Sequence, residues 1–450
     1  MKKIRDILSL PLIKNTLKLS SSSALMMLLP LIVTPILSRL YTPEEYGDWG
    51  VFSSVFYIVN SFLFLSYENS IVKTNERDDV PNLIGVSAIS ASLVIFLTFV
   101  TFFIGRLLGV GFFVDFPSLF LLIIILIAQA AHTLCNCIAN REKKYGVMSI
   151  SNIISGVTQA SFRILFGIIP LVTYGLIVGN VIAQVATTIF IIIFLRYFFN
   201  KSFFQNLSVK KMRELAYDNR KFPLYDAPAR LIEFSVGNLA LIILTFYWSK
   251  EVIGCYSMIM QFLLLPIAVV GSAMGNVFYR EISENVNDKQ TIRQTTKRAS
   301  RITFGLCFLP MLFLACGGDH ILVYILGERW KTAGIIALCL SIQSVPVILT
   351  EPLLPLYRSL NRQETRFRWN LLNFFFSLGV LLIMSNITDN LNIVLIIYSI
   401  AIAIVRYLMF YSLIHLAGLK VLDVSRYFYY LSIIAFIVLG IRLYIEILMC

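Results

Sequence analysis

The sequence predicts an all-α polytopic membrane protein, and three observations lead to this class. Of the 450 residues, 58% are hydrophobic and only 14% are charged, whereas a soluble protein carries roughly a quarter charged residues. The mean hydropathy is +0.80. Continuous apolar runs of about 20 residues, long enough to cross a ~30 Å hydrocarbon layer as helices, recur along the whole chain. Because the runs are continuous and not alternating, they disfavour a membrane β-barrel.

The apolar runs divide into two groups of six predicted core membrane helices. The predicted spans are 17–38, 49–70, 83–104, 117–138, 149–170 and 174–196, followed by 225–248, 252–278, 300–317, 333–357, 367–386 and 391–414. A last apolar stretch over 427–447 is either a thirteenth span or a segment along the outer interface, because Arg442 and Glu446 interrupt it.

This spacing predicts two lobes. We expect a six-helix lobe over 1–196, a basic cytoplasmic linker over 197–222, a second six-helix lobe over 223–416 and an extra hydrophobic segment over 417–450.

Basic residues between the spans predict the orientation. The formal net charge is +13, and most Lys and Arg residues fall in alternate loops, as the positive-inside rule requires. This places the N-terminus and the linker around Lys210 in the cytoplasm and Glu44 and Lys250 outside. The same rule accounts for the charge without a nucleic-acid partner. The apolar run behind the basic N-terminus is long, which favours a retained first span over a signal peptide.

A weak internal repeat supports the two lobes. Residues 41–49 match residues 248–256 in the order aromatic, Glu, Gly, aromatic at identical spacings, with Gly47 corresponding to Gly254. Six spans per repeat is an even number, so the repeats keep one orientation and are related by an axis along the membrane normal. Such a design usually places the substrate path between the halves.

Span seven carries charges where a membrane helix normally has none. Asp226, Arg230, Glu233 and Gly237 recur at spacings of four, three and four, so they share one helical face. A charge at the bilayer centre costs about 3 kcal/mol even on the most permissive scale, so this face must line a wet or protein-filled interior. A structural alternative is an ion pair of Arg230 with Asp226 or Glu233 on the same helix.

Three other arginines are candidates for binding an anionic group. Arg163 and Arg406 lie within spans, and Arg39 lies at the outer end of span one. A guanidinium donates to two oxygens of a phosphate at once, which favours a role for these residues and Arg230 in phosphate binding. Snorkelling to the interface is the alternative for Arg39 and Arg406.

Several other polar residues are candidates for a cavity or for ion coupling. Glu233 and Glu68 are the leading acids for proton or sodium antiport, although a purely structural role at the end of span two is favoured for Glu68. Interhelical hydrogen bonds, worth ~1 kcal/mol each, are the alternative for the uncharged candidates. The cavity-lining candidates are Asp226, Asn60, Gln159 and Gln261.

No pattern indicates an enzyme, a cofactor or a metal site. The seven cysteines are scattered, and Cys135 and Cys137 lack the partner ligands of a zinc site. The sequence has no P-loop, no Gly-rich dinucleotide motif and no nucleophile–histidine–acid constellation.

Several segments in both halves carry the pattern of a known family. In the second half these segments are Phe222–Pro228, Ile253–Ser257, Leu265–Pro266 and Val277–Tyr279. In the first half they are Ser38–Gly47 and the Tyr67–Val72 segment that closes span two. These segments resemble the Wzx-type O-antigen and capsule flippases of the MOP (multidrug/oligosaccharidyl-lipid/polysaccharide) superfamily. The resemblance extends over nearly the whole chain. Span one lacks the acidic residue with which many drug-exporting relatives couple to cations.

The resemblance implies a V-shaped pair of six-helix lobes in the bacterial inner membrane. It implies transfer of an undecaprenyl-diphosphate-linked oligosaccharide from the cytoplasmic to the outer leaflet by ion-coupled alternating access. The implied partners are this lipid-linked substrate, H⁺ or Na⁺, membrane lipids, and a polysaccharide polymerase with its chain-length regulator. The alternatives are a multidrug/cation antiporter, a flippase for a lipid-linked peptidoglycan precursor and, less favoured, a membrane glycosyltransferase or polymerase.

Overall fold

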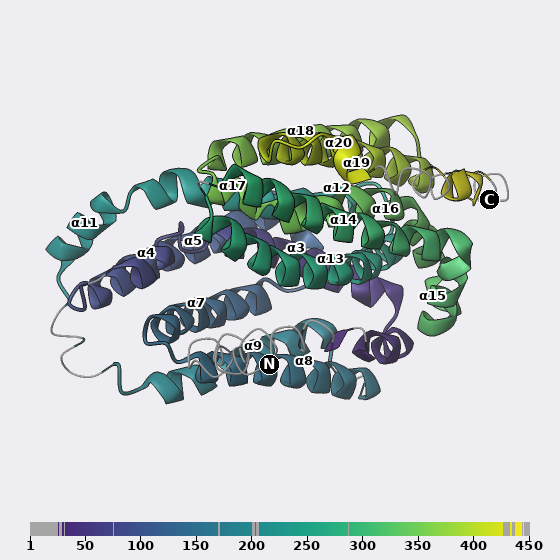
Figure 1. Cartoon of the computed structure of the whole chain (residues 1–450). Helices are drawn as coiled ribbons and strands as arrows, with labels where there is room; N and C mark the ends of the chain where they lie inside the picture. Colours follow the sequence, from purple (N-terminus) through teal and green to yellow (C-terminus); the bar gives the residue numbers. More distant parts are fainter. Residues whose placement is uncertain are drawn as a thin grey trace. The chain divides into compact units, whose positions relative to one another are not determined.

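The computed structural model is all-helical over the part of the chain that it describes (Figure 1). The described residues are 26, 29–30, 32–74, 76–169, 172–199, 203, 207–286, 288–425, 433, 437–442 and 444. The basic N-terminus and the start of span one therefore lie outside them, as do Glu446 and most of the stretch 427–447. The contacts within the chain define two compact units, one formed by Met1–Tyr41 and Asp48–Phe234 and the other by Thr42–Gly47 and Ser235–Cys450.

Most of the helices overlap the predicted spans, although several of their ends differ. Those of the first half are α3 (Pro43–Phe62), α4 (Glu68–Lys73), α5 (Val80–Leu107), α6 (Gly111–Val114), α7 (Leu119–Arg141), α8 (Tyr145–Ile168) and α9 (Gly175–Leu195). The linker region forms α11 (Val209–Asp218) and the π-helical turn η1 (Phe222–Asp226), which leads into α12 (Ala227–Leu244).

The second half continues with α13 (Lys250–Glu284), α14 (Lys289–Phe313), η2 (Leu314–Gly318), α15 (Asp319–Leu326), η3 (Glu328–Trp330) and α16 (Lys331–Thr350). It ends with η4 (Glu351–Leu353), α17 (Pro355–Ser359), α18 (Gln363–Ile387), α19 (Leu391–Leu416) and α20 (Val421–Ser425). Among the described residues, eight helices are long and apolar enough to cross a membrane, and each of them overlaps a predicted span.

Side-chain caps define several helix starts. At α3, the Oγ1 of Thr42 accepts from the backbone N–H of Glu45, and the Glu45 carboxylate accepts from the N–H of Thr42 at 2.7 Å. This reciprocal capping box, with Pro43 at the first helical position, satisfies donors that a helix start would otherwise leave unpaired. Asn390 caps α19 in a similar way, accepting from the two backbone N–H groups of Asn392 and Ile393.

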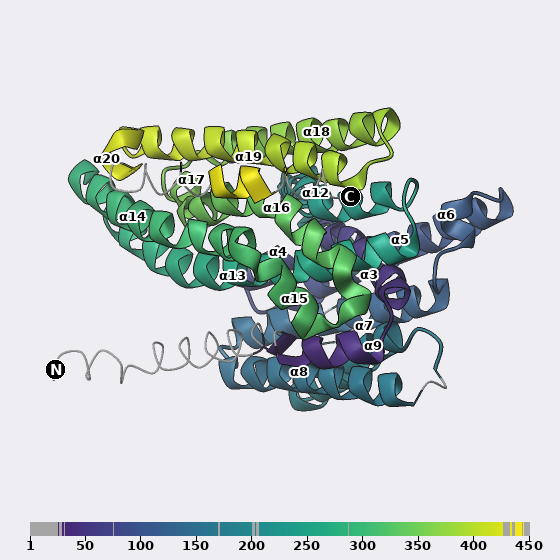
Figure 2. The same cartoon turned by 90° about the vertical axis from the view of Figure 1, so that its right-hand side faces the viewer.

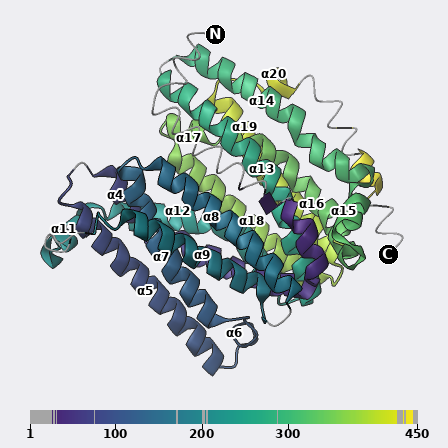
Figure 3. The same ribbon diagram turned by 90° about the horizontal axis from the view of Figure 1, so that it is seen from below.

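In the first unit, α8 packs along α9, and α9 packs along α7 (Figure 3). The linker helix α11 lies against one end of α5. Apolar side chains from α4, α5, α7 and α9 form a buried core that includes Ile71, Leu83, Ile138 and Ile191. This core fixes the end of the unit at which α4 and α11 meet, and the candidate site lies there.

In the second unit, α18 and α19 run side by side (Figure 2), and α16 is the most deeply buried helix. α15 begins after a kink at Gly317, whose φ of 102° suits a glycine. Arg442 donates a hydrogen bond to the buried Asp319 at 3.2 Å. The charge that interrupts the last apolar stretch therefore neutralises a buried carboxylate at the start of α15.

Two repeat-related glycines meet in the second unit, where the start of α3 crosses the start of α13. A Cβ atom on Gly47 would overlap the carbonyl oxygen of Lys250, and one on Gly254 would overlap that of Pro43. Only glycine allows backbones to approach this closely. Next to the crossing, the buried rings of Tyr46 and Trp330 pack edge to face, with centroids 5.1 Å apart.

Candidate functional site

Span two is not one continuous helix, contrary to the single span predicted over 49–70. α3 ends at Phe62, residues 63–67 form turns, and α4 begins at Glu68. Leu65 and Ser66 have φ values of 50° and 63°, in the left-handed region that costs a non-glycine residue of order 1 kcal/mol or more. Broken membrane helices occur where the freed backbone is buried in protein or lines a cavity, and transporters bind substrates and ions at such breaks.

Glu68, the first residue after the break, forms an ion pair with Arg230 of α12. The Nη1 of Arg230 lies 2.5 Å from the Oε1 of Glu68. The two side chains differ in exposure, with 8% for Glu68 and 46% for Arg230. Two candidates that are 162 residues apart in sequence are therefore brought together within the first unit. The contact joins the broken span two to the charged face of α12.

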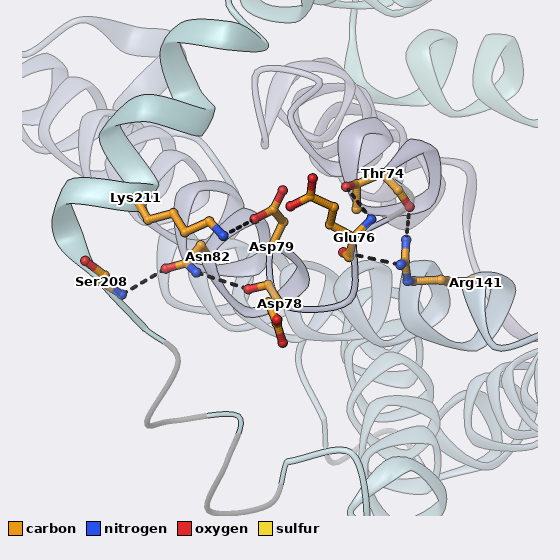
Figure 4. Close-up of polar contacts among 8 residues, drawn as sticks. All are labelled: Thr74, Glu76, Asp78, Asp79, Asn82, Arg141, Ser208 and Lys211. Carbon is orange, nitrogen blue, oxygen red and sulfur yellow. Dashed lines mark hydrogen bonds and ion pairs between the residues drawn. The ribbon is translucent and has the colours of Figure 1, made fainter.

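The segment after α4 is held by Arg141 at the end of α7. Its guanidinium donates to the carbonyl oxygens of Ile71 at 3.1 Å and Glu76 at 3.5 Å, and also to that of Thr74 (Figure 4). A guanidinium at these carbonyls satisfies acceptors that the end of a short helix leaves unpaired. α4 is thus fixed at its end by Arg141 and at its start by the Glu68–Arg230 pair.

Figure 4 also shows how the linker helix is attached to this end of the unit. The Nζ of Lys211 lies 2.5 Å from the Oδ1 of Asp79, just before α5, and the backbone N–H of Ser208 donates to the Oδ1 of Asn82 at 2.9 Å. The hydrogen bond with Asp79 raises the pKa of Lys211, because the carboxylate favours the charged ammonium. The basic linker is therefore anchored by named contacts to the helix that follows the broken span.

Arg163 is buried within the first unit, where its side chain and its backbone carbonyl both make contacts. Its side chain stacks on Trp49, with 4.2 Å between the guanidinium carbon and the ring centroid, and its Nε donates to the carbonyl oxygen of Leu176 at 3.3 Å. Its own carbonyl accepts from the Tyr41 hydroxyl at 2.7 Å. Gly179 leaves room for the arginine stem, since a Cβ there would lie 3.0 Å from its Cγ. The predicted intramembrane arginine thus binds an aromatic ring and a backbone carbonyl.

Arg406 forms an ion pair within the second unit. Its Nη1 lies 3.1 Å from the Oε1 of Glu351, and both side chains are partly buried. Glu351 opens η4, another interruption of a predicted span, and Gly271 of α13 packs against its Cβ. Snorkelling of Arg406 to the membrane interface does not by itself account for this ion pair.

The remaining predicted site residues are dispersed. Gln159 donates to the side chain of Asn180 at 2.6 Å, which is the interhelical hydrogen bond expected as the alternative to a cavity role. Asn60 is half-buried in the last turn of α3, and Gln261 is half-buried in α13. Arg39, Asp226 and Glu233 are exposed.

Some residues of the site were missed from the sequence. The break after Phe62 contains neither Gly nor Pro, so no local signal indicated it. Trp49, Arg141 and Asp79 were not among the predicted site residues, although they contact Arg163, the end of α4 and Lys211, respectively. Among the described residues, no three His, Cys, Asp or Glu side chains lie close enough together to hold a metal ion.

Solved structures of low sequence identity share this fold. The lipid II flippase MurJ, in an inward closed conformation, aligns with a TM-score of 0.69 at 13% identity over 95% of this chain and 97% of that chain. An inward-facing multidrug resistance MATE transporter of the MOP superfamily aligns with a TM-score of 0.68 at 13% identity over 87% and 94%. A MOP superfamily transporter from Pyrococcus furiosus aligns with a TM-score of 0.59 at 14% identity over 90% and 96%. No curated protein matches the chain in sequence.

The fold is therefore that of multi-pass membrane proteins, and it is shared with solved transporters of the MOP superfamily. The chain belongs to the polysaccharide biosynthesis protein family, whose model matches residues 36–335. The expected resemblance is thereby confirmed at the level of family and fold.

Proposed function

We propose that this protein is a flippase that moves an undecaprenyl-diphosphate-linked oligosaccharide, an O-antigen or capsule repeat unit, from the cytoplasmic to the outer leaflet of the inner membrane. Membership of the polysaccharide biosynthesis protein family supports the polysaccharide precursor. The proposed orientation has the N-terminus and α11 in the cytoplasm, and two pseudo-symmetric lobes alternately expose the substrate path. The single observation that carries the residue-level proposal is the half-exposed Arg230 beside the break in span two.

The diphosphate explains why a guanidinium is needed at this position. The headgroup must cross a low-dielectric region with its anionic oxygens attached, and an uncompensated buried charge costs several kcal/mol or more. The planar guanidinium donates to two phosphate oxygens at once, and charge-assisted hydrogen bonds of this kind are about twice as strong as neutral ones. Arg230 is the exposed partner of its ion pair, so in this proposal it exchanges Glu68 for the phosphate. Arg163, Arg39 and Arg406 remain candidates for further contacts.

The test uses proteoliposomes that contain the purified full-length protein and an undecaprenyl-diphosphate-linked trisaccharide. Transfer is measured as the fraction of sugar that becomes accessible to an impermeant lectin. We expect Arg230→Ala to slow transfer by about tenfold or more, because hydrogen bonds to charged groups contribute roughly 1.5–3 kcal/mol. Arg230→Lys should reduce the transfer rate less than Arg230→Ala, because the charge stays while the bidentate geometry is lost. Arg196→Ala, at an exposed arginine that ends α9, is the matched control and should transfer at the wild-type rate.

Two outcomes would contradict the proposal. Wild-type transfer by a well-folded Arg230→Ala variant would remove the headgroup role of this residue. Transport of a cationic dye without transfer of the lipid would replace the flippase by a multidrug antiporter. Lipid II in a parallel reaction tests the peptidoglycan-precursor alternative directly.

A further inference from the structure

The two side chains of the Glu68–Arg230 pair differ in solvent exposure, and this difference matters if Arg230 exchanges Glu68 for another anion. Glu68 is 6% exposed, and its second carboxylate oxygen, Oε2, is buried without a hydrogen-bond partner among the described residues. Arg230 keeps nearly half of its side chain exposed. The carboxylate is therefore fixed inside the first unit, while the guanidinium remains accessible to a ligand.

The other charged and titratable groups around Glu68 do not replace Arg230. On α7, Cys137 lies within electrostatic reach of the pair, and Arg141 donates to the backbone carbonyls described above. On α4, Lys73 lies over the ring of Phe222, 5.9 Å from its centroid. Next to α5, the carboxylate of Asp79 is paired with the linker lysine. Among the described residues, the cation that contacts the Glu68 carboxylate is that of Arg230.

Removing Arg230 from this carboxylate leaves a buried anion without its counter-charge. Breaking a buried pair in this way is strongly unfavourable, because the remaining charge is neither solvated nor compensated. The least demanding remedy is a proton, which needs no additional space and converts the carboxylate to a neutral acid. Among the described residues, Oε2 of Glu68 has no hydrogen bond that protonation would break.

Resting on the proposed function, we infer that Glu68 takes up a proton when an anionic diphosphate headgroup takes Arg230. The proton comes from water and binds a carboxylate oxygen of Glu68, so one guanidinium–carboxylate pair is replaced by a guanidinium–phosphate pair and a neutral acid. The headgroup and the proton then bind together. Binding of the headgroup therefore favours binding of the proton. In proton antiport the linkage is opposite, because the substrate and the proton compete for binding.

The experiment measures proton uptake on binding. The full-length protein in lipid nanodiscs is titrated calorimetrically with farnesyl diphosphate in two buffers of different ionisation enthalpy, at pH 7 and pH 8. Wild type should take up close to one proton more per ligand than Glu68→Gln, and its affinity should fall from pH 7 to pH 8 more steeply than that of the variant. Glu68→Gln should bind about tenfold more tightly than wild type at pH 8, because Arg230 no longer has a competing carboxylate.

Glu214→Gln, which removes an exposed carboxylate from α11, is the matched control and should keep the wild-type proton uptake. Equal uptake by wild type and Glu68→Gln would overturn the linkage and leave the headgroup role of Arg230 intact. Unchanged binding by Arg230→Ala would instead remove the proposed headgroup site, and the linkage with it. If Glu68→Gln does not fold, infrared difference spectra of wild type with and without farnesyl diphosphate decide, since a new protonated-carboxyl band supports the linkage and its absence rejects it.

Discussion

At the scale of single residues, Arg163 and Arg230 differ in exposure and in contacts, although the sequence predicts both as intramembrane arginines. Arg163 is 7% exposed and engaged with Trp49 and a backbone carbonyl, whereas Arg230 is half-exposed and holds one carboxylate. A guanidinium that is stacked and buried contributes mainly to stability, while an accessible one can change partners. Mutations at the two positions should therefore affect different properties.

We expect Arg163→Ala to destabilise the protein by about 2–3 kcal/mol, because it removes the stacking on Trp49 and a buried hydrogen bond. The measurement is the melting temperature of the detergent-solubilised protein, followed by the loss of monodisperse material on heating. Arg163→Lys should lose less stability than Arg163→Ala, because the lysine ammonium can still lie over the ring of Trp49. An unchanged melting temperature for Arg163→Ala would contradict the structural role, and any loss of export in this variant must be corrected for its amount in the membrane.

At the scale of elements, the break between α3 and α4 is strained where it carries Leu65 and Ser66 in left-handed conformations. Ser66→Gly should stabilise the protein by about 1 kcal/mol, because glycine adopts this conformation without steric cost. Ser61→Gly, five residues earlier inside α3, is the matched control and should destabilise by about 1 kcal/mol. The two melting temperatures should move in opposite directions. A decrease in both would show that the break is not a source of strain.

The attachment of the linker helix is a second element with a predictable response. Since its pKa is raised in the folded state, Lys211 contributes its stabilisation in full below the unfolded-state value of about 10.4 and loses it as the pH rises through the folded value. A spin label at position 209, in a background without the exposed Cys316, should therefore keep constant mobility from about pH 6 to pH 9 and gain mobility only above about pH 10.4.

Two variants check this assignment. Lys211→Met should raise the label's mobility throughout the same pH range, because the contact with Asp79 is lost. Lys210→Met, at the exposed neighbouring position, should leave it unchanged. Equal mobility in wild type and Lys211→Met would mean that other contacts hold α11 in place.

At the scale of the whole molecule, hydropathy and loop charge were sufficient to predict the class. Most of the described part of the predicted spans is helical, because burial in lipid requires every backbone group to be satisfied within the segment, and span two is the main exception. The comparisons confirm the family and the fold that the resemblance implied. The division into two six-helix lobes and the orientation in the membrane stay predictions.

The candidate site could be predicted only in part. Arg230 is predicted as a costly intramembrane charge and Glu68 as a coupling or structural acid, but their pairing joins residues 162 positions apart and depends on tertiary packing. The break after Phe62 lacks Gly and Pro and follows from the contacts that hold α4, which local propensity does not describe. Gln159 shows the converse case, since a polar residue on a helical face is satisfied by its neighbour Asn180.

The glycine crossing between α3 and α13 has a consequence for the order of events during synthesis. Residues Thr42–Gly47 belong to the second unit, yet the ribosome makes them long before Lys250 and Gly254, against which they pack. At a synthesis rate of about 5–20 residues per second, the first glycine waits roughly 10–40 s for the second. During that interval the start of α3 emerges with its capping box but without its tertiary partner, exposed to the membrane insertion machinery. The second unit therefore completes its packing around a segment that is already inserted. In a nascent chain arrested before residue 250, this segment should remain accessible to chemical modification from outside the membrane.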